Sequence, residues 1–442
     1  MKNIKLSFWG FLIALTALWL LADPMLSMPY QFLALRSSLI NYTGIVGIGV
    51  MSVAMILATR PVIFEPYLGG LDKMYRLHKW LGISGLVMSI AHWLCTQAPK
   101  WFVSLGWIGR PARQAQPEQT LAVFRYFQSQ RGLAEAIGEW AFYATVVLIV
   151  LALVKWFPYR LFFKTHRLLA LVYLFLVFHA VVLMRYSYWG EIIGPVMVLL
   201  MIPGSAAALI VLFRKVGRGR RAMGLIDNFI YHKYLGVLEV TIQLKGRWSG
   251  HKAGQFAFVT FDDKEGAHPF TLSSAWEGDG RMLFIIKGLG DYTKTLPATL
   301  KVGALVKVEG PYGEFNFSSN KPRQIWVGGG IGITPFIARM KKLARQPDGK
   351  RIDLFYTTTH LDAEAIEMLQ HDANLANVKL HVLVESRDGR LNAERICRAV
   401  PKWKSSDIWF CGPAAFGHDL RRDFCARRLD SDDFHQELFE MR

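Results

Sequence analysis

The sequence predicts a membrane protein in three parts: an all-α bundle of six spanning helices, an antiparallel β-barrel, and an α/β domain with a parallel sheet. Residues 1–213 contain six long apolar runs without Lys, Arg, Asp or Glu, whereas residues 222–442 have the composition of a soluble protein. The soluble half opens with short β-type runs separated by turn residues. From Gln324 onward, predicted strands alternate with helices, which is typical of a parallel sheet.

The six apolar runs are the candidate membrane helices. Most have the ~17–25 residues that a spanning helix needs, and the short fourth run needs residues from upstream to cross a bilayer. The first run follows Lys2 and Lys5 as a signal peptide would, but no small-x-small cleavage site follows it, so we expect it to be retained. The runs are Leu6–Ala22, Ser37–Thr59, Trp80–Pro99, Trp140–Val154, Leu168–Met184 and Ile192–Phe213.

Basic residues predict the orientation of these helices. With the N-terminus inside, fifteen Lys and Arg residues flank the runs on the cytoplasmic side and seven lie outside, five of them in the 98–139 loop. Both termini are then cytoplasmic, in a plasma or inner membrane. This asymmetry accounts for much of the +18 net charge, and no motif supports binding of nucleic acid.

We expect domain boundaries where the sequence pattern changes. The helical part is 1–213, a basic linker is 214–221, the barrel is 222–320, and the parallel-sheet domain is 321–442. The four cysteines lack CxxC spacing, which argues against a disulfide framework and against a zinc or iron–sulfur site. Predicted barrel strands are Gly236–Gln243, Gln255–Thr260, Leu283–Lys287 and Val306–Glu309; the later strands are Gln324–Val327, Ile352–Tyr356, Lys379–Val384 and Asp407–Phe410, with helices at Pro335–Leu343 and Ala363–His371.

Four histidines carry the strongest chemical signal in the apolar half. His78 and His92 are fourteen residues apart, and His166 and His179 are thirteen apart, so each pair brackets an uncharged run. A histidine inside a membrane span is costly and usually functional, although a single one is often a hydrogen-bonded packing residue. Fourteen residues of helix rise about 21 Å, so two such helices predict two bis-imidazole haem sites stacked across the bilayer. Ligands this far apart on one helix cannot share one zinc ion.

The spacing of thirteen leaves a geometric question open. At about 100° per residue, fourteen residues return to nearly the same helix face, whereas thirteen residues land about 140° away. The helix that carries His166 and His179 therefore needs either a local change of winding or side chains that reach in different directions.

A glycine-rich segment, Val327–Pro335, follows a predicted strand. Bare glycine backbone lets a diphosphate approach, and the N-terminus of the next helix offers free N–H groups and the positive end of its dipole. Pro335 suits a first helical turn. The segment departs from the G-x-G-x-x-G fingerprint because position 333 is Ile, so a nucleotide site and a tight structural turn are both open interpretations.

Two further segments carry weaker signals. The segment His268–Ser274, HPFTLSS, places hydroxyl groups beside an aromatic ring, as a flavin site requires, although a plain strand end has the same pattern. The segment Lys287–Thr293, KGLGDYT, offers a Lys and backbone N–H groups to a diphosphate, or is simply a hairpin turn before a helix.

In this order, the features resemble the NADPH oxidase and ferric reductase superfamily over nearly the whole chain. The histidines on the third and fifth helices are similar to that family's two-haem core, HPFTLSS to its flavin-binding strand, and GGGIGITPF to its pyridine-nucleotide loop. Cys411-Gly-Pro413 resembles the motif near the nicotinamide. The resemblance implies a fold with a six-helix haem bundle, an FAD-binding barrel and an NAD(P)H-binding α/β domain.

The resemblance also implies roles for individual residues. His78 with His166 would ligate an inner b-type haem, and His92 with His179 an outer one. Cys411 would act near the nicotinamide, and Phe439 is the candidate for a terminal aromatic over the flavin ring. The implied contacts to FAD and to the nucleotide are His268, Pro269, Phe270, Thr271, Ser273, Ser274, Lys287, Thr293, Gly330, Gly332, Thr334 and Pro335.

Two departures from the family bear on its substrates. The animal oxidases carry a further His one turn beyond the outer ligand, where this chain has Thr96, which weakens the case for efficient oxygen reduction. No Arg follows the strand Ile352–Tyr356, where several relatives bind the 2′-phosphate of NADP. Instead, Ser386 and Arg387, with Arg390, resemble the phosphate-binding pair of ferredoxin reductases, or form an ordinary turn. The sequence therefore favours NADPH, with NADH possible.

The predicted function is transmembrane electron transfer from cytoplasmic NADPH through FAD and two haems to an acceptor outside. Ferric chelates are the favoured acceptor. The alternatives are oxygen, reduced to superoxide, and an extracytoplasmic protein partner that docks on the 98–139 loop.

Overall fold

The computed structural model describes residues 2–23, 32–107, 109, 119–154, 156–360 and 362–437. The chain forms two compact units, each considered by itself below. The helical unit comprises 1–64 and 73–216, and the sheet unit comprises 65–72 and 217–442. The short segment 65–72 thus packs with the sheet unit although the chain on both sides of it belongs to the helical unit.

Six helical spans of the described chain are long and apolar enough to cross a membrane, as the six apolar runs predict. With 34 and 32 residues, the two longest rise about 50 Å, beyond the ~30 Å hydrocarbon core. The short fourth run does extend upstream, as far as Ala122. The spans are α1 (Lys2–Ala22), α2 (Phe32–Ala58), α4 (Leu71–Ser104), α5 (Ala122–Leu153), α6 with α7 (Tyr159–His166 and Leu168–Leu183) and α8 (Ile193–Leu212).

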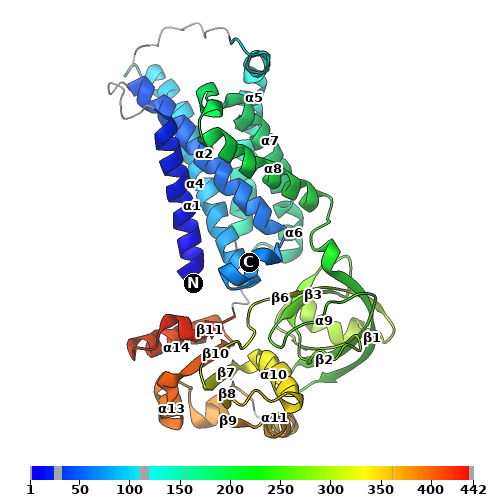
Figure 1. Cartoon of the computed structure of the whole chain (residues 1–442). Helices are drawn as coiled ribbons and strands as arrows, with labels where there is room; N and C mark the ends of the chain where they lie inside the picture. Colours follow the sequence, from blue (N-terminus) through cyan, green and yellow to red (C-terminus); the bar gives the residue numbers. More distant parts are fainter. Residues whose placement is uncertain are drawn as a thin grey trace. The chain divides into compact units, whose positions relative to one another are not determined.

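Helices α2, α7 and α8 pack against one another in the helical unit (Figure 1). Their side chains form much of its core. Within this core the Tyr173 hydroxyl lies 2.8 Å from Ser52 Oγ, in hydrogen-bond contact. A Cβ at Gly204 would lie 2.2 Å from the same hydroxyl, so glycine is what lets α8 approach α7 this closely. Helix α5 packs on α7 as well. Helix α7, which carries His179, therefore packs against α2, α5 and α8.

The chain between His166 and His179 is not one continuous helix. Helix α6 ends at His166, Arg167 forms a turn, and α7 begins at Leu168. The Ala170 amide donates to the Arg167 carbonyl at 3.1 Å, a three-residue step in place of the four-residue step of an α-helix. Of the two alternatives that the thirteen-residue spacing leaves open, the structure has the local change of winding.

The first part of the sheet unit is a six-stranded antiparallel sheet in the order β4-β3-β6-β1-β2-β5. Its edges meet, because Leu272 pairs with Phe284 and the Ser273 amide donates to the Leu283 carbonyl at 2.8 Å. The sheet is therefore closed into the predicted barrel around a buried apolar core. Its elements are β1 (Arg221–His232), β2 (Val237–Lys245), β3 (Phe256–Thr260), β4 (His268–Thr271), β5 (Arg281–Lys287), α9 (Asp291–Thr299) and β6 (Leu305–Tyr312).

The second part is a five-stranded parallel sheet in the order β11-β10-β7-β8-β9, as the alternation of strands and helices predicts. Two apolar clusters of buried residues, built from its strands and helices, form its core. The strands are β7 (Arg323–Gly329), β8 (Arg351–Thr358), β9 (Val378–Val384), β10 (Ser406–Cys411) and β11 (Phe434–Gln436); the helices are α10 (Thr334–Arg345), α11 (Ala363–Leu375), α12 (Glu385–Asp388), α13 (Ala393–Ala399) and α14 (Ala414–Ala426).

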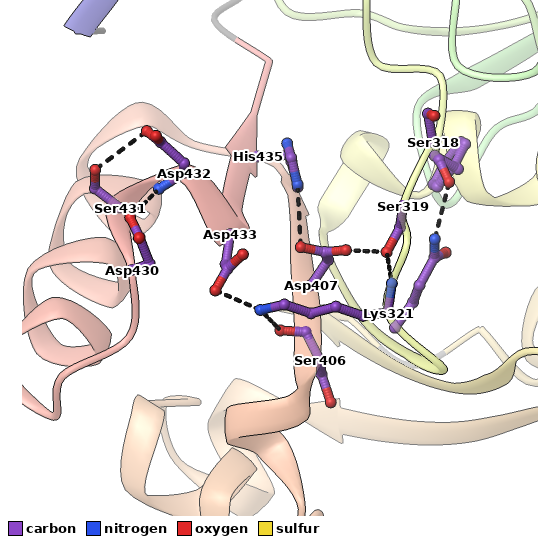
Figure 2. Close-up of polar contacts among 12 residues, drawn as sticks. Ser318, Ser319, Lys321, Ser406, Asp407, Asp430, Ser431, Asp432, Asp433 and His435 are labelled. Carbon is purple, nitrogen blue, oxygen red and sulfur yellow. Dashed lines mark hydrogen bonds and ion pairs between the residues drawn. The ribbon is translucent and has the colours of Figure 1, made fainter.

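A polar network fastens β11 to the start of β10 (Figure 2). Asp407 of β10 accepts a hydrogen bond from Ser319 and lies 3.5 Å from His435 Nε2 of β11. Burial raises the pKa of the Asp407 carboxyl, but the hydrogen bonds from His435 and Ser319 outweigh it and leave the pKa below its usual value. Lys321 pairs with Asp433 just before β11. The network therefore anchors the last described strand to its sheet.

Candidate functional site

The four membrane histidines form two pairs between α4 and the α6–α7 span. In the 78/166 pair, the ring centroids of His78 and His166 lie 5.9 Å apart. In the 92/179 pair, those of His92 and His179 lie 6.1 Å apart. A metal ion at about 2 Å from one nitrogen of each imidazole separates the two ring centroids by about 6 Å. Both pairs therefore have the spacing of a bis-imidazole metal site.

Backbone carbonyls set the orientation of three of these rings. Nδ1 of His78 donates to the Ala54 carbonyl at 2.9 Å, and Nδ1 of His92 to the Ile40 carbonyl at 3.0 Å. Nδ1 of His179 donates to the carbonyl of Ala134 at 2.8 Å. Because a carbonyl only accepts, these bonds fix the proton on Nδ1 and leave the Nε2 lone pair for a metal. This arrangement fits haem ligation.

The remaining ring, His166, is held differently. Its Nδ1 is buried without a hydrogen-bond partner among the described residues, and the ring stacks on Phe162 with centroids 5.0 Å apart. His166 is the last residue of α6, at the break before α7. Helix winding and stacking therefore orient His166, whereas hydrogen bonds orient the other three.

Close backbone approach also shapes the 92/179 pair. A Cβ at Gly138 of α5 would lie 2.1 Å from His179 Nδ1, so the ring occupies space that any side chain there would fill. On α2, Arg36 Nε donates to the Cys95 carbonyl at 2.9 Å, one turn beyond His92. The Thr96 hydroxyl donates to the carbonyl of Trp93 within its own helix, at 2.7 Å.

Two segments that the sequence marks separately meet on the barrel. The His268 ring, at the start of β4, stacks on Tyr292 of α9 with centroids 4.6 Å apart and planes at 24°. This contact joins the HPFTLSS segment to the KGLGDYT segment. Burial lowers the pKa of His268, so its ring is neutral near pH 7. Phe270 packs against the barrel core.

The hydroxyl groups of Ser274 and Thr293 in these segments already have protein partners. Ser274 Oγ accepts from the Leu283 amide at 3.2 Å, and Thr293 Oγ1 accepts from the Gly290 amide at 3.0 Å, where it caps α9. Ser273 is fully buried. The serine and threonine side chains therefore help to shape the barrel end, and their contact with FAD remains a prediction. The other predicted contacts are Pro269 and Thr271 within β4 and Lys287 at the end of β5.

The glycine-rich segment turns sharply from β7 into α10. Gly330 has φ +55°, and a Cβ at Gly332 would lie 2.1 Å from the Cys411 carbonyl oxygen. Pro335 occupies the first turn of α10, and the Thr334 hydroxyl donates to the carbonyl of the preceding turn at 3.2 Å. The left-handed backbone thus accounts for Gly330 and close packing for Gly332, and the same turn brings the α10 N-terminus beside the end of β10.

Cys411 ends β10 next to Gly328 of β7, at the carboxyl edge of the parallel sheet. Burial raises the pKa of its thiol well above the usual value, and the Glu437 carboxylate raises it further. Glu437 is itself buried, directly after β11. The sequence pattern did not single out Glu437, because the pairing of β11 with β10 is what brings it to Cys411. Phe439 lies outside the described residues.

The predicted phosphate-binding residues lie on and just after α12. Arg387 pairs with Asp388 at 3.0 Å, and Arg390 with Glu385 at 2.6 Å. The arginine side chains are 63% and 89% exposed, so water screens both pairs. Ser386 lies within the same short helix. A bound phosphate would compete with neighbouring carboxylates for the two arginines.

Comparison with known families matches two regions of the chain. Residues 43–177 match the ferric reductase like transmembrane component, and residues 230–316 match an FAD-binding domain. The first region includes His78, His92 and His166, and it ends just before His179. The second includes the HPFTLSS and KGLGDYT segments.

Known proteins share parts of this chain at low identity. The toluate 1,2-dioxygenase electron transfer component of Pseudomonas putida is 26% identical over 196 residues, 42% of this chain and 58% of that protein. A heavy chain of the superoxide-generating NADPH oxidase of Dictyostelium discoideum is 28% identical over 213 residues, 42% of this chain and 37% of that protein. The chain thus spans between about a third and three fifths of the length of these two relatives.

Among solved structures, the flavohemoglobin from Malassezia yamatoensis with bound FAD and heme aligns over 91% of this chain and 98% of its own, with a TM-score of 0.49 and 16% identity. The two regions are identified by the sequence matches at residues 43–177 and 230–316, and not by this structural alignment. The chain combines, in this order, a ferric reductase like transmembrane component and an FAD-binding domain, as the NADPH oxidase and ferric reductase superfamily does.

Proposed function

We propose that this protein moves electrons across a membrane, from cytoplasmic NADPH to an acceptor on the opposite side. The main support is the two histidine pairs, whose ring centroids lie 5.9 and 6.1 Å apart, on helices long enough to span the bilayer. FAD, when bound, converts a two-electron donor into one-electron steps, and b-type haems carry single electrons. In the proposed orientation both termini are cytoplasmic, because the basic residues gather on that side.

Each histidine pair would hold one haem through Nε2. His78 and His166 form the inner site, and His92 and His179 the outer site. The hydrogen bonds from Nδ1 to backbone carbonyls keep His78, His92 and His179 in the ligating tautomer and make the ligand more basic. About 21 Å of helix α4 separates its two ligands, so the two sites lie at different depths of the bilayer.

The residues of the sheet unit would bind the flavin and the nucleotide. The barrel end with His268, Phe270 and Ser274 would take FAD, and the α10 N-terminus at Thr334 would face the nucleotide diphosphate. The buried Cys411 thiol stays protonated because burial raises its pKa, so it would serve as an uncharged wall beside the nicotinamide. Phe439 would cover the flavin ring.

Arg387 and Arg390 would bind the 2′-phosphate of NADPH once their carboxylate partners release them. Arg387→Ala should raise the KM for NADPH by roughly ten- to a hundredfold and leave that for NADH nearly unchanged, since a charge-assisted hydrogen bond contributes about 1.5–3 kcal/mol. Arg398→Ala is the matched control, because Arg398 is similarly exposed and pairs with Glu394 at 2.9 Å. Equal losses with both nucleotides would remove Arg387 from the site.

Ferric chelates are the acceptor that we propose first, since Thr96 stands where animal oxidases have a further histidine. Reduction of oxygen to superoxide is the second candidate, favoured by the similarity to the Dictyostelium oxidase heavy chain. Purified protein, given NADPH, oxygen and ferric citrate, should be monitored separately for ferrous iron and for superoxide. Ferrous iron formed under anaerobic conditions supports the first candidate. A haem content of one per chain would contradict the proposed relay.

A further inference from the structure

The segment Glu65–Asp72 packs against Gly313 and Glu314, the residues that follow β6. It begins with α3 (Glu65–Leu68), and the amides of Gly69 and Gly70 donate back to the Glu65 carbonyl at 2.7 and 2.9 Å. Gly70 has φ +115°, and a Cβ there would lie 3.3 Å from the amide nitrogen of Glu314. Glycine thus lets the segment lie directly on the turn that follows β6.

The Glu65 side chain makes the central contact of this closure. Its exposed fraction is 3%, and Oε2 accepts a hydrogen bond from the Gly313 amide at 2.6 Å. The other oxygen, Oε1, is buried and has no hydrogen-bond partner among the described residues. Burying a charged carboxylate with one oxygen that accepts no hydrogen bond costs much free energy. A neutral acid in the same place costs less, because it leaves only a hydroxyl without a partner.

The charges around Glu65 do not offset its burial. Burial raises its pKa to about 7; the Gly313 amide and Arg220 lower it, while Glu314 and Asp72 raise it. Arg220 also donates to the Pro311 carbonyl at 2.9 Å. Among the neighbouring acids, Glu309 is paired with Arg221 and bonded by Tyr312, and Glu437 faces Gly313 from the chain end.

Gly313 links Glu65 to the predicted nucleotide site, because it lies beside Glu437, which in turn lies near Cys411. A Cβ at Gly313 would lie 3.4 Å from Glu437 Oε1, and Glu437 is the carboxylate that acts on Cys411. Gln255 Nε2 donates to the Gly313 carbonyl at 3.2 Å from the barrel side. The Gly313 turn therefore lies between Glu65 and the buried groups at the end of β10.

We infer that Glu65 is a protonatable positioning residue: as a neutral acid it holds the segment Glu65–Asp72 against Gly313, and its ionisation loosens that contact. Its effect on electron transfer rests on the function proposed above, whereas the contact itself does not. Glu65 bonds the Gly313 amide, so it would act through Gly313 on the groups at the end of β10.

The direction of the pH effect follows from the two pKa values. Glu65 is called docked when it is bonded to the Gly313 amide and released when that contact is broken. The docked side chain has a pKa of about 7 and the released one its ordinary value of 4.5, so the docked form binds the proton more tightly. Docking is strongest at low pH and weakens as the pH rises toward 7, above which it levels off. Between about pH 6 and pH 8 the docking equilibrium constant should fall by about tenfold.

Hydrogen exchange of the full chain, followed by mass spectrometry, tests the contact without any turnover. Protection of residues 65–72 and 311–315 should fall severalfold from about pH 6 to pH 8 in the wild type, after correction for intrinsic exchange. Glu65→Gln keeps an acceptor for the Gly313 amide, so its protection should stay high at both pH values. Glu65→Ala should lose protection at both. Glu364→Gln, at an exposed carboxylate of α11, is the matched control and should behave as the wild type does.

The same pH dependence in wild type and Glu65→Gln would overturn the inference, even if Glu65→Ala fails to fold. The loaded protein adds a second measurement: the rate of haem reduction by NADPH, relative to flavin reduction, should fall with rising pH only where Glu65 is present. A wild type that reduces flavin but no haem refutes the proposed function and leaves the exchange test of Glu65 valid. A ratio independent of pH, alongside pH-dependent exchange, would refute the role in electron transfer and leave only the contact.

Discussion

The two histidine pairs have nearly the same spacing but are built by different means. In the 92/179 pair both rings are oriented by hydrogen bonds to backbone carbonyls, and the His179 ring fills the space left by Gly138. In the 78/166 pair only His78 has such a bond among the described residues, and His166 depends on the end of α6 and on stacking with Phe162. One site is therefore fixed by complementary backbone and the other by helix winding.

This difference teaches that equal spacing does not mean equal rigidity. A ring held by a hydrogen bond and a close backbone is preorganised for its metal, and a single added methyl group can destroy that fit. A ring at a helix break tolerates neighbours but depends on the dihedral angles of two or three residues. The two sites should consequently fail in response to different mutations.

Removing an outer ligand should have the largest effect and separates the sites outright. His179→Leu or His92→Leu should abolish the outer haem and stop reduction of an impermeant outside acceptor. Flavin reduction by NADPH should persist, and the inner haem should stay reducible, because the 78/166 pair lies about 21 Å of helix away. Stopped-flow spectra should show normal bleaching of flavin and one remaining haem α-band. Delivery of electrons to the outside by either mutant would refute the two-haem relay.

Adding one methyl group to α5 should nearly reproduce that loss. In Gly138→Ala the new Cβ would lie 2.1 Å from His179 Nδ1, so the ring must leave its place and give up its bond to the Ala134 carbonyl. Outer-haem content should fall severely while the inner haem remains. Gly132→Ala is the control, since a Cβ there meets no atom of the described residues within 4 Å and alanine favours the helix. Equal haem content in the two variants would show that the backbone does not fix the outer site.

The sequence predicted both pairs but not the way each is held. Spacing identified the four histidines, and between His166 and His179 it left two alternatives open, a local change of winding or side chains that reach in different directions. It did not identify Ala54, Ile40 or Ala134 as partners, because carbonyl acceptors carry no side-chain signature. The sequence did not predict a role for Gly138 either, since a glycine in a helix becomes informative only when its neighbour in space is known.

The soluble half shows a similar division. Alternation of strands and helices predicted the parallel sheet, and turn residues predicted the barrel. The strand β1 was missed because only its first half alternates in burial, before the irregular register at Asp227. Glu437 was missed because its place beside Cys411 results from the pairing of β11, a strand of three residues. Long-range pairing and close approach are therefore what the sequence pattern left out.

A proline at the helix break should weaken the inner site selectively, the reverse of Gly138→Ala. Arg167 has φ −62°, which suits proline, but proline disfavours helical dihedral angles at the residue before it, and that residue is His166. Arg167→Pro should lower inner-haem content and leave the outer haem bound. Arg167→Gln controls for the lost charge and should keep both haems. Loss of both haems in the proline variant would mean that the break serves the whole bundle.

Removing one hydroxyl near the outer site should have the smallest effect. Thr43 Oγ1 lies 3.1 Å from His92 Nδ1, but the Ile40 carbonyl accepts from the same nitrogen at 3.0 Å, so the ring keeps its orientation without the threonine. Thr43→Val should weaken the outer haem by less than about tenfold, the range of one neutral hydrogen bond. Thr145→Val is the control, because that buried hydroxyl bonds only its own helix at Ala141 among the described contacts. Comparison of haem dissociation rates decides the matter. A loss as large as that of Gly138→Ala would mean that a side chain, and not the backbone, orients His92, and the contrast between the two pairs would then fail at its outer member.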